Sequence, residues 1–434
     1  MNQWLKEHEL WIIIIILLAG LFIRGGLIFT VTEPIDRDAK EYFDIAQNIV
    51  TGNGFSIDSV QPTARRSPGY PAALAAVMAV FGAEPKTLYV FQALVNVLTI
   101  FLVYLSLKYT NIKSPLRLFI LLLFSISASF IYVNVLYAEI LTMLAVAFLL
   151  LLSIHPSMQS HSIMQSILIG ILIGFLAFLR PTFLYLPFFL LICVVIVKIF
   201  SHRFPIRNYL LIVGVTLLTI APWTIRNYVV FRQFIPLVSA GGGELWGANF
   251  EIANRVVWNS VSDIQKYEDQ RTANHALQNR LIVEYSQQNA LDNPEELNRF
   301  LSRQGKAIIL AHPFRYALLS FNRLMIFWFS PPIGSATLKS ISPILFVIIL
   351  LIKYSLTILA IFGLWNLARR DLAGSFVWLV LIVYLTLLHS ATHSIQRYFL
   401  PVIPLVYFSL GYYLNSLTYL IHKPRSSQRA RSAF

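Results

Sequence analysis

Long apolar runs separated by short polar stretches dominate this chain. About ten of the runs approach the roughly 20 residues that a helix needs to cross about 30 Å of hydrocarbon. Backbone groups inside lipid are satisfied only in helices or closed barrels, so runs of this length predict helices. The predicted spans are residues 10–30, 86–107, 116–135, 138–154, 163–179, 182–199, 208–225, 341–367, 374–392 and 398–420.

Composition agrees with a membrane protein. Hydrophobic residues make up 57% of the chain and charged residues 12%, too few polar groups to cover a surface in water. The first run lacks an A-x-A cleavage pattern and many more runs follow, so we expect an uncleaved anchor. The one cysteine, Cys193, lies in an apolar run and has no partner for an intrachain disulfide. We expect an all-α, polytopic membrane protein with residues 1–434 in a single domain.

Lys and Arg gather in alternate loops. They concentrate at residues 108–117, 198–207 and 369–370, and again in a basic tail at 421–434. With ten spans these segments all lie on one side, which the positive-inside rule assigns to the cytoplasm together with both termini. The loop at 155–162 has only histidines and does not bear on the orientation. Anionic lipid headgroups then account for the formal net charge of +14, and we expect no nucleic-acid partner.

Two long polar segments, residues 31–85 and 226–340, lie on the opposite, outer side in this topology. A transporter typically concentrates polar residues at the midplane of broken helices, whereas here they gather outside the spans. The pattern favours chemistry at the membrane surface. A transporter or lipid flippase is the alternative, with Arg24, Glu139 and Arg180 along its pathway. A scaffold without catalysis is a third hypothesis, and a lipid-linked polysaccharide polymerase is the nearest competitor among enzymes.

The stretch DRDAKEYFDIAQNIVTGNGF, residues 36–55, opens the first outer segment. Asp38 and Tyr42 follow helical spacing with the apolar positions after them, as in a helix that lies along the membrane interface. Solvated acids on an amphipathic connector would give the same periodicity. The glycines at 52 and 54 end the predicted helix.

An arginine pair follows in QPTARRSPGYPAALAAVMAVFG, residues 61–82. Arg65 and Arg66 precede a Ser-Pro-Gly-Tyr-Pro turn that contains Tyr70 and leads into a short apolar segment. A guanidinium pair beside the headgroups either holds a phosphate through forked hydrogen bonds or anchors the chain to lipid. The first outer segment therefore carries acids and two arginines in one loop.

Three segments together resemble a known family. The first runs from DRDAKEYF to RRSPGYPAALA, the second is APWTIRNYVVFRQFIPLVSAGGGELWGAN at residues 221–249, and the third is RYFLPVIP at residues 397–404. They resemble the polyprenyl-phosphate-dependent glycosyltransferases of the C-type (GT-C) fold, among them bacterial proteins similar to protein O-mannosyltransferases and to the lipid A aminoarabinose transferase. The chain departs from that pattern at Ala39, where many relatives carry a second acid, and Asp36 offers a competing alignment for Asp38.

The resemblance implies inverting transfer of one sugar from a polyprenyl-phosphate donor to a glycan, lipid or protein acceptor at the outer face of the cell membrane. By carry-over, Asp38 is the base that takes the proton of the acceptor hydroxyl, with Asp36 and Glu139 as the other candidate acids. The leaving polyprenyl phosphate is an anion and needs cationic stabilisation. Arg66 matches the basic residue that precedes the proline turn in the family and is the first candidate for that contact.

Further basic residues are candidates for binding the donor phosphate. They are Arg65, Arg180, Arg226 and Arg397. Arg180 would alternatively cap a helix end by bonding its last carbonyls, and Arg226 leaves a span where either role is available. Arg24, toward the outer end of the first span, is instead expected to snorkel to the interface.

Aromatic and polar residues near these charges are candidates for the substrate cavity. They are Tyr42, Tyr70, Trp246, Asn249 and His393. Trp246 either stacks on a sugar or prenyl chain or anchors the chain at the interface. His389 and His393 lack a third ligand at fixed spacing, so we predict no metal site and no cofactor. A divalent ion beside the catalytic carboxylate stays an open alternative.

The second outer segment contains a glycine run at 241–243 and then DNPEELNRFLSRQGKAIILAHP, residues 292–313. Asn293 suits a helix cap and Pro294 the first turn, so the pattern predicts an amphipathic helix that stops at Pro313. The aromatic stretch after it is expected to lie at the interface or dip into it. We expect this region to cover the cavity and select the acceptor.

Overall fold

The computed structural model describes residues 2–31, 35–155, 162–200, 205–239, 241–254, 264–288, 294–331 and 339–421. Helices account for nearly all of this part, and β pairing within it is limited to an isolated bridge between Ser56 and Pro62. The predicted all-α polytopic membrane architecture is confirmed. The basic tail after residue 421, most of the 155–162 loop and the Asn293 cap lie outside the described residues.

Seven segments in the described part are long and apolar enough to cross a membrane. They are α2 (Glu9–Thr30), α5 (Pro85–Tyr109), the stretch Pro181–Ile199 with α9 (Leu186–Phe200), α10 (Ile206–Phe231), α16 (Pro343–Arg370), the stretch Gly374–Ala391 in α17 (Leu372–Ala391), and the stretch Gln396–Thr418 with η3 (Gln396–Val402) and α18 (Ile403–Ile421). Three further predicted spans correspond to the shorter helices α6 (Ser114–Ser125), α7 (Glu139–Ile154) and α8 (Ile163–Leu179). The count of ten spans therefore stays a prediction.

The predicted span at 116–135 is not one continuous α-helix. α6 ends at Ser125, and the chain continues as the 3-10 helix η1 (Ala128–Asn134). The break falls in the serine-rich stretch SISAS, where the hydroxyls of Ser127 and Ser129 lie 2.8 Å apart. Serine hydroxyls offer local hydrogen bonds that compete with the helix. A hydrophobicity pattern does not register this competition.

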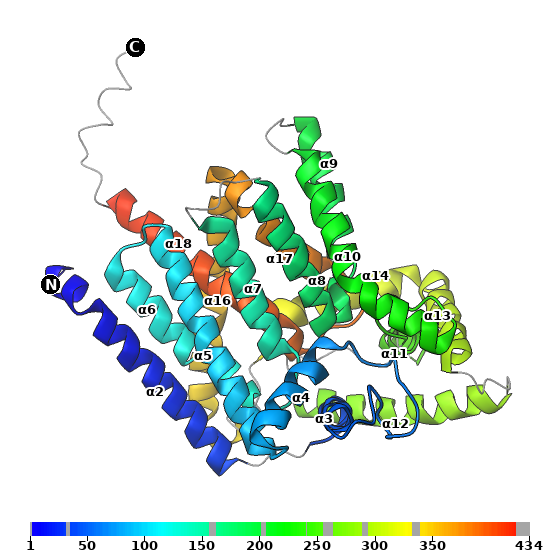
Figure 1. Ribbon diagram of the computed structural model, residues 1–434. Helices are drawn as coiled ribbons and strands as arrows, with labels where there is room; N and C mark the ends of the chain where they lie inside the picture. The colour runs from blue at the N-terminus through cyan, green and yellow to red at the C-terminus, as the bar shows by residue number, and fades with distance from the viewer. Residues whose placement is uncertain are drawn as a thin grey trace.

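The spanning helices pack side by side as a bundle (Figure 1). α8 and α10 approach closely because α8 presents glycine: a Cβ at Gly170 would lie 2.8 Å from Val215, and one at Gly174 would lie 2.6 Å from Thr219. Small residues bring helix backbones together in this way inside membranes. The hydroxyl of Thr216 adds a hydrogen bond to the Gly170 carbonyl at 3.0 Å.

The predicted snorkelling of Arg24 is wrong, because its side chain is fully buried between helices. Its Nε and Nη2 donate to Asn96 Oδ1 at 2.9 and 2.6 Å. Its Nη1 donates to the carbonyls of Gly20 at 2.8 Å and Ser125 at 3.1 Å. A buried guanidinium satisfied by acceptors from α2, α5 and α6 ties these helices together.

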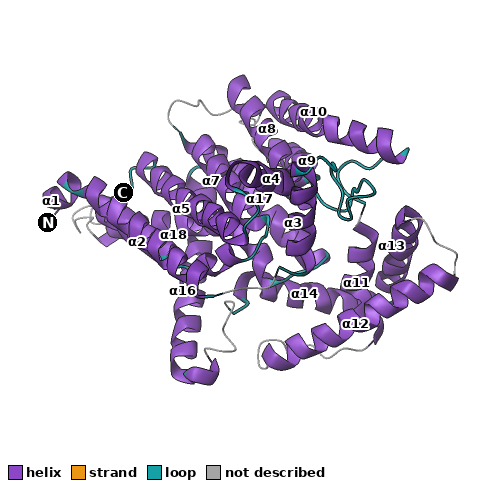
Figure 2. Cartoon of the chain, turned by 60° about the horizontal axis from the view of Figure 1, so that its bottom comes forward, coloured by secondary structure: helices purple, strands orange, loops and turns teal. Residues whose placement is uncertain are grey.

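Two groups of helices lie outside the spans. α3 (Arg37–Val50) packs against α4 (Gly69–Phe81) in the first outer segment, and Gly52, with a φ of +84°, lies just beyond the end of α3. The second outer segment forms α11 (Gly241–Asn254), α12 (Ile264–Gln288), α13 (Pro294–Ala311) and α14 (Pro313–Phe329). The predicted helix that ends before Pro313 is confirmed as α13. Figure 2 shows α11, α12 and α13 as one group beside the bundle, with α3 nearby.

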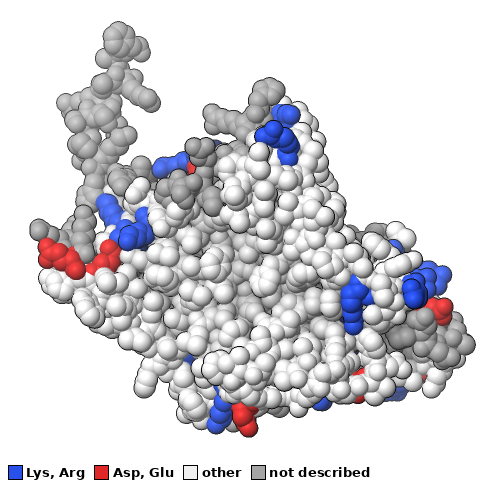
Figure 3. Space-filling view, in the orientation of Figure 1, with Lys and Arg blue, Asp and Glu red and all other residues white. Residues whose placement is uncertain are grey.

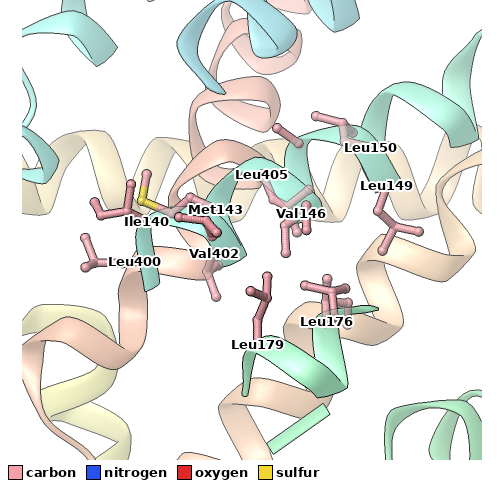
Figure 4. Close-up of a cluster of buried hydrophobic side chains, with 14 of the residues drawn as sticks. Ile140, Met143, Val146, Leu149, Leu150, Leu176, Leu179, Leu400, Val402 and Leu405 are labelled. Atoms are coloured by element: carbon pink, nitrogen blue, oxygen red, sulfur yellow. The ribbon is translucent and has the colours of Figure 1, made fainter. Parts of the chain in front are cut away.

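The charges of the molecule follow the same division. On the face shown in Figure 3 the broad centre is uncharged, and Lys and Arg lie around its edges. Inside the bundle, apolar side chains of α7, α8, η3 and α18 form the cluster of Figure 4, among them Met143, Val146, Leu179, Val402 and Leu405. The cluster also includes Ile140 and Leu400, which closely follow the charged residues Glu139 and Arg397 in the chain.

Candidate active site

Asp38 and two arginines from distant parts of the chain form the centre of the site. Asp38 lies in the first turn of α3, and its Oδ1 accepts a hydrogen bond from Arg66 Nη2 at 2.6 Å. Its Oδ2 accepts one from Arg397 Nη2 in η3. The first outer segment and the last spanning segment therefore meet at this carboxylate, although Asp38 and Arg397 are 359 positions apart in the chain.

The Arg66 guanidinium also binds a second acid of α3. Its Nε donates to Glu41 Oε2 at 2.6 Å, and Arg65 Nε lies 3.0 Å from the other oxygen, Glu41 Oε1. The predictions did not include Glu41. The signal was present, because residues three apart in a helix share a face and Asp38 and Glu41 have this spacing.

A third carboxylate extends the network into the bundle. Glu139 is the first residue of α7 and is only 4% exposed. Its Oε1 lies 3.5 Å from Arg397 Nε and 3.4 Å from Arg180 Nη1. An acid at a helix N-terminus also interacts favourably with the helix dipole. Glu139 thus contacts both Arg397 and Arg180, and Arg397 links it to Asp38.

Aromatic rings surround the guanidinium groups. Arg66 lies over the ring of Tyr42 at 5.2 Å, and Arg397 lies over Tyr137 at 4.1 Å. Arg180 lies over Tyr398 at 4.6 Å. Stacking on aromatic faces stabilises desolvated guanidinium groups and limits their rotation. The arginines are thus held in place by both charge and ring contacts.

Arginine is the most frequent charged residue in these ion pairs. Four guanidinium groups pair with three carboxylates. Arginine presents several N–H donors in a fixed fork, so each can bind a phosphate oxygen in addition to its present partner or in its place. The arrangement is suited to binding an anion.

Ion pairing controls the ionisation of Asp38. Burial would raise its pKa, but the guanidinium groups of Arg397 and Arg66 lower it to about 2, from the ordinary 3.8. Because the folded-state pKa is the lower one, Asp38 stabilises the fold above pH 3.8 and loses this contribution as the pH falls toward about 2. Burial raises the pKa of Tyr42 to about 12, so its hydroxyl stays protonated. At neutral pH Asp38 is a stable anion and a weak base.

Several predicted residues lie away from this cluster. Asp36 is exposed and lies 4.0 Å from Arg37. Arg226 donates to the Thr63 carbonyl at 2.9 Å and lies over Trp223 at 4.7 Å, so it holds the first outer segment against α10. The structure therefore gives Asp38 rather than Asp36 the central place, and it gives Arg226 a supporting contact.

The predicted cavity residues separate into two groups. Tyr70 is buried beside Tyr42, with ring centroids 4.9 Å apart, and its hydroxyl donates to Gln92 at 2.8 Å. His393 lies edge-on to the ring of Tyr398 at 5.8 Å. Trp246 is 2% exposed and packs in a small core of α11 and α13. Tyr42, Tyr70 and His393 thus lie beside residues of the cluster, and Trp246 does not.

Asn249 lies in α11, where it supports the second outer segment. Its Nδ2 donates to the Leu245 carbonyl at 2.8 Å, and its Oδ1 accepts from Arg323 Nη2 at 3.4 Å. Arg323 belongs to α14 and also donates to the Ala248 carbonyl. These bonds fix α11 against α14.

One acid that the predictions did not include also faces the cluster. Glu244, in the first turn of α11, interacts electrostatically with Asp38, Arg66, Arg397 and Arg65. Glu244 is exposed to solvent. Desolvation by the protein around it raises its pKa above 4.5, and the charge of Asp38 adds to the effect. No short motif marks Glu244, because its position depends on how α11 packs.

Metal ligation requires several donors around one point. Within the ranges that the structure describes, no group of three or more His, Cys, Asp or Glu side chains is arranged to hold an ion. The carboxylates of the cluster are instead separated by guanidinium groups. We assign no metal ligands.

The fold resembles that of known membrane enzymes. The archaeal oligosaccharyltransferase AglB from Archaeoglobus fulgidus, solved in complex with an inhibitory peptide and a dolichol-phosphate, matches with a TM-score of 0.53 and 14% sequence identity over 98% of this chain and 52% of that chain. The chain has a GT-C-like fold. The family resemblance seen in the sequence is thus confirmed at the level of the fold.

A second solved chain, an Archaeoglobus fulgidus oligosaccharyltransferase in complex with Zn and sulfate, has a TM-score of 0.48 and 13% identity over 94% of this chain and 51% of that one. This chain spans about half the length of the two solved chains. No protein-family profile and no curated protein sequence matches it. Its function is therefore argued from its own site.

Proposed function

We propose that the protein is a membrane glycosyltransferase that moves one sugar from a polyprenyl-phosphate donor to an acceptor hydroxyl at the outer face of the cell membrane. The observation that carries this proposal is the network of Arg66, Asp38, Arg397, Glu139 and Arg180 at one end of a GT-C-like bundle. The acceptor belongs to a glycan, a lipid or a protein. The AglB complex holds a dolichol-phosphate and a peptide, which supports a lipid-linked donor.

The arginines would bind the phosphate of the donor. Glycosyl transfer breaks the bond between the anomeric carbon and a phosphate oxygen, and negative charge grows on that oxygen in the transition state. Arg66 and Arg397 converge on Asp38, so their N–H groups already point at an anion between them. Preorganised donors of this kind stabilise developing charge without reorganisation. The donor phosphate would take the place next to Asp38 or partly displace it.

Asp38 would hold these arginines ready. The carry-over from the family names it as the base, and this role stays a prediction. In the structure both of its oxygens accept hydrogen bonds from guanidinium groups that we expect to bind the phosphate. We propose that Asp38 is a positioning residue, whose charge keeps Arg66 and Arg397 oriented before the donor arrives.

The test compares two charge deletions in the first outer segment. Arg66→Gln removes a guanidinium of the network, and Lys40→Gln removes an exposed charge that pairs with Asp44 on α3. Each protein is assayed in nanodiscs with synthetic undecaprenyl-phosphate hexoses and pentoses. Membrane lipid extract, a serine-rich peptide and water serve as acceptors, and the readout is free undecaprenyl phosphate.

We expect the wild type and Lys40→Gln to release undecaprenyl phosphate at similar rates. Arg66→Gln is expected to lose about 100-fold in kcat/KM, the scale of one oxyanion contact. Equal turnover in Arg66→Gln would remove the arginine network from the mechanism. A folded wild type that turns over no donor would contradict glycosyl transfer and favour a transporter.

A further inference from the structure

Glu244 lies on the side of α11 that faces away from the neighbouring helix α13. Two residues before it, the Gly242 amide donates to Asn298 Oδ1 of α13 at 2.6 Å, and two residues after it Trp246 is buried in the α11–α13 core. A step of two residues turns a helix by about 200°. The packing of α11 on α13 therefore directs Glu244 to the opposite side, away from α13.

The charged groups that interact with Glu244 belong to the arginine network. It interacts with Asp38 of α3, with Arg65 and Arg66, and with Arg397 and Tyr398 of η3. Among the helices packed against α11, α14 carries Arg323, which bonds the Ala248 carbonyl and Asn249. α12 and α13 contact α11 through Gln278 and Asn298. Within the described ranges no cation forms an ion pair with Glu244 inside 4 Å.

The geometry of an inverting reaction assigns different roles to Asp38 and Glu244. In an inverting displacement the acceptor oxygen attacks the face of the anomeric carbon opposite to the leaving phosphate. A base on the acceptor must then lie across the sugar from the residues that hold the phosphate. Asp38 is bonded directly to Arg66 and Arg397, which places it on the phosphate side. Glu244 faces the same cluster from another segment without being bonded to it.

We propose that Glu244 is the base that takes the proton of the acceptor hydroxyl, which deepens the glycosyl transfer proposed above and rests on it. The acceptor oxygen forms the new bond to the anomeric carbon as its proton passes to the Glu244 carboxylate. The bond from that carbon to the phosphate oxygen breaks, and its electron pair stays on polyprenyl phosphate beside the arginines. The proton on Glu244 is then released to water. Each bond formed is matched by a bond broken, with no further reactant.

The ionisation of the two acids agrees with this division. A general base works best when its pKa lies near the working pH. Burial, followed by the charge of Asp38, raises the pKa of Glu244 above 4.5, whereas the arginines hold that of Asp38 at about 2. The acid limb of kcat/KM reports groups of the free enzyme. Glu244 would set that limb above pH 4.5, and Asp38 would set it near pH 2, outside the usual range of assay.

The experiment compares three conservative variants in nanodiscs. Glu244→Gln removes the proposed base, Asp38→Asn alters the arginine partner, and Glu284→Gln makes the same change on an exposed acid of α12. The donor probe is the undecaprenyl-phosphate sugar that the wild type turns over fastest. We measure kcat/KM from pH 4 to pH 8, and separately the binding of undecaprenyl phosphate by native mass spectrometry.

We expect Glu244→Gln to lose about 100-fold or more in kcat, to lose the acid limb and to bind undecaprenyl phosphate as the wild type does. Glu244→Asp should recover part of the rate and restore the limb. Asp38→Asn should weaken donor binding and keep the limb, and Glu284→Gln should match the wild type. Full activity in Glu244→Gln, or loss of the limb in Asp38→Asn alone, would overturn the proposal. Absence of turnover in the wild type would instead contradict the proposed function.

Discussion

The two outer segments contribute to the same site but differ in how their charges are paired. In the first, α3 and the loop before α4 present Asp38, Glu41, Arg65 and Arg66, and each of these charges has a partner. In the second, α11 presents Glu244 without an ion-pair partner in the described ranges. The paired charges suit a fixed binding site for phosphate. The unpaired acid suits a group that must gain and lose a proton.

The two segments also differ in how they are attached. The first is seated on the bundle: Tyr70 donates to Gln92 of α5, and a Cβ at Gly69 would lie 2.8 Å from the Phe178 carbonyl of α8. In the second, α11 to α13 have a core of their own around Trp246. Its last helix, α14, joins the bundle through Phe327 and Trp328, which pack on Phe399, and through Tyr316, which donates to the Ala391 carbonyl at 2.8 Å. A donor that enters from the bilayer needs a fixed site, whereas a segment with its own core can vary with the acceptor.

The largest effect is expected at the residue that joins the first segment to the bundle. Arg397→Gln removes the guanidinium between Asp38 and Glu139, so activity should fall about 100- to 1,000-fold. Stability should fall by up to about 3 kcal/mol, the lower end for a broken buried pair, because Arg66 and Arg180 remain. Thermal unfolding and undecaprenyl phosphate release are the measurements.

Arg397→Lys is the matched control for this prediction. It keeps the charge and loses the forked geometry, so it should recover much of the stability and only a small part of the activity. If the Gln and Lys variants lose equal activity and stability, the residue acts through packing on Tyr137 rather than through charge. A wild-type rate in Arg397→Gln would show that the first segment binds phosphate without the bundle.

An effect of intermediate size is expected from a substitution that destabilises only the second outer segment. Trp246→Ala should cost about 3 kcal/mol in the local core of the second segment, since truncation leaves a cavity beside Phe250 and Leu301. Limited proteolysis of α11 to α13 should increase and sugar transfer should fall, while undecaprenyl phosphate binding changes less than about twofold. Trp365→Ala, at an exposed tryptophan of α16, is the control. Loss of donor binding together with transfer would show that the two segments do not act separately.

Sequence patterns predict local features of this molecule well. Apolar periodicity predicted α2, α5, α7 and α8, and cap and proline signals predicted where α13 ends. Family resemblance placed Asp38, Arg66, Glu139 and Arg397 among the candidates, and the cost of a charge beside a span added Arg180. The structure brings these five together. Four of these residues lie at the end of a helix or in its first turn, and Arg66 lies in the loop before α4. Such positions can be read from one stretch of chain.

Features set by distant contacts could not be predicted. The burial of Arg24 depends on Asn96, 72 positions away, so its charge alone predicted snorkelling. Trp246 was expected at a cavity or an interface, but its surroundings are set by α13. The placement of Glu244 depends on the same packing of α11 against α13. The local sequence, a glycine-rich stretch before a Leu-Trp pair, does not predict which face of α11 packs against another segment.

The smallest effect is expected at Arg65, the outermost member of the network. Its side chain is 62% exposed and pairs with Glu41, which also binds Arg66. An exposed ion pair contributes about 0.2–1 kcal/mol and weakens with salt. Arg65→Gln should therefore raise the donor KM less than about threefold, with kcat unchanged, and the change should fade between 50 and 500 mM salt. Steady-state assays at both ionic strengths measure this. If Arg65→Gln loses as much activity as Arg66→Gln at high salt, the donor phosphate binds at Arg65 rather than between Arg66 and Arg397. The contrast between paired charges that bind the donor phosphate and an unpaired acid that serves the acceptor would then be wrong.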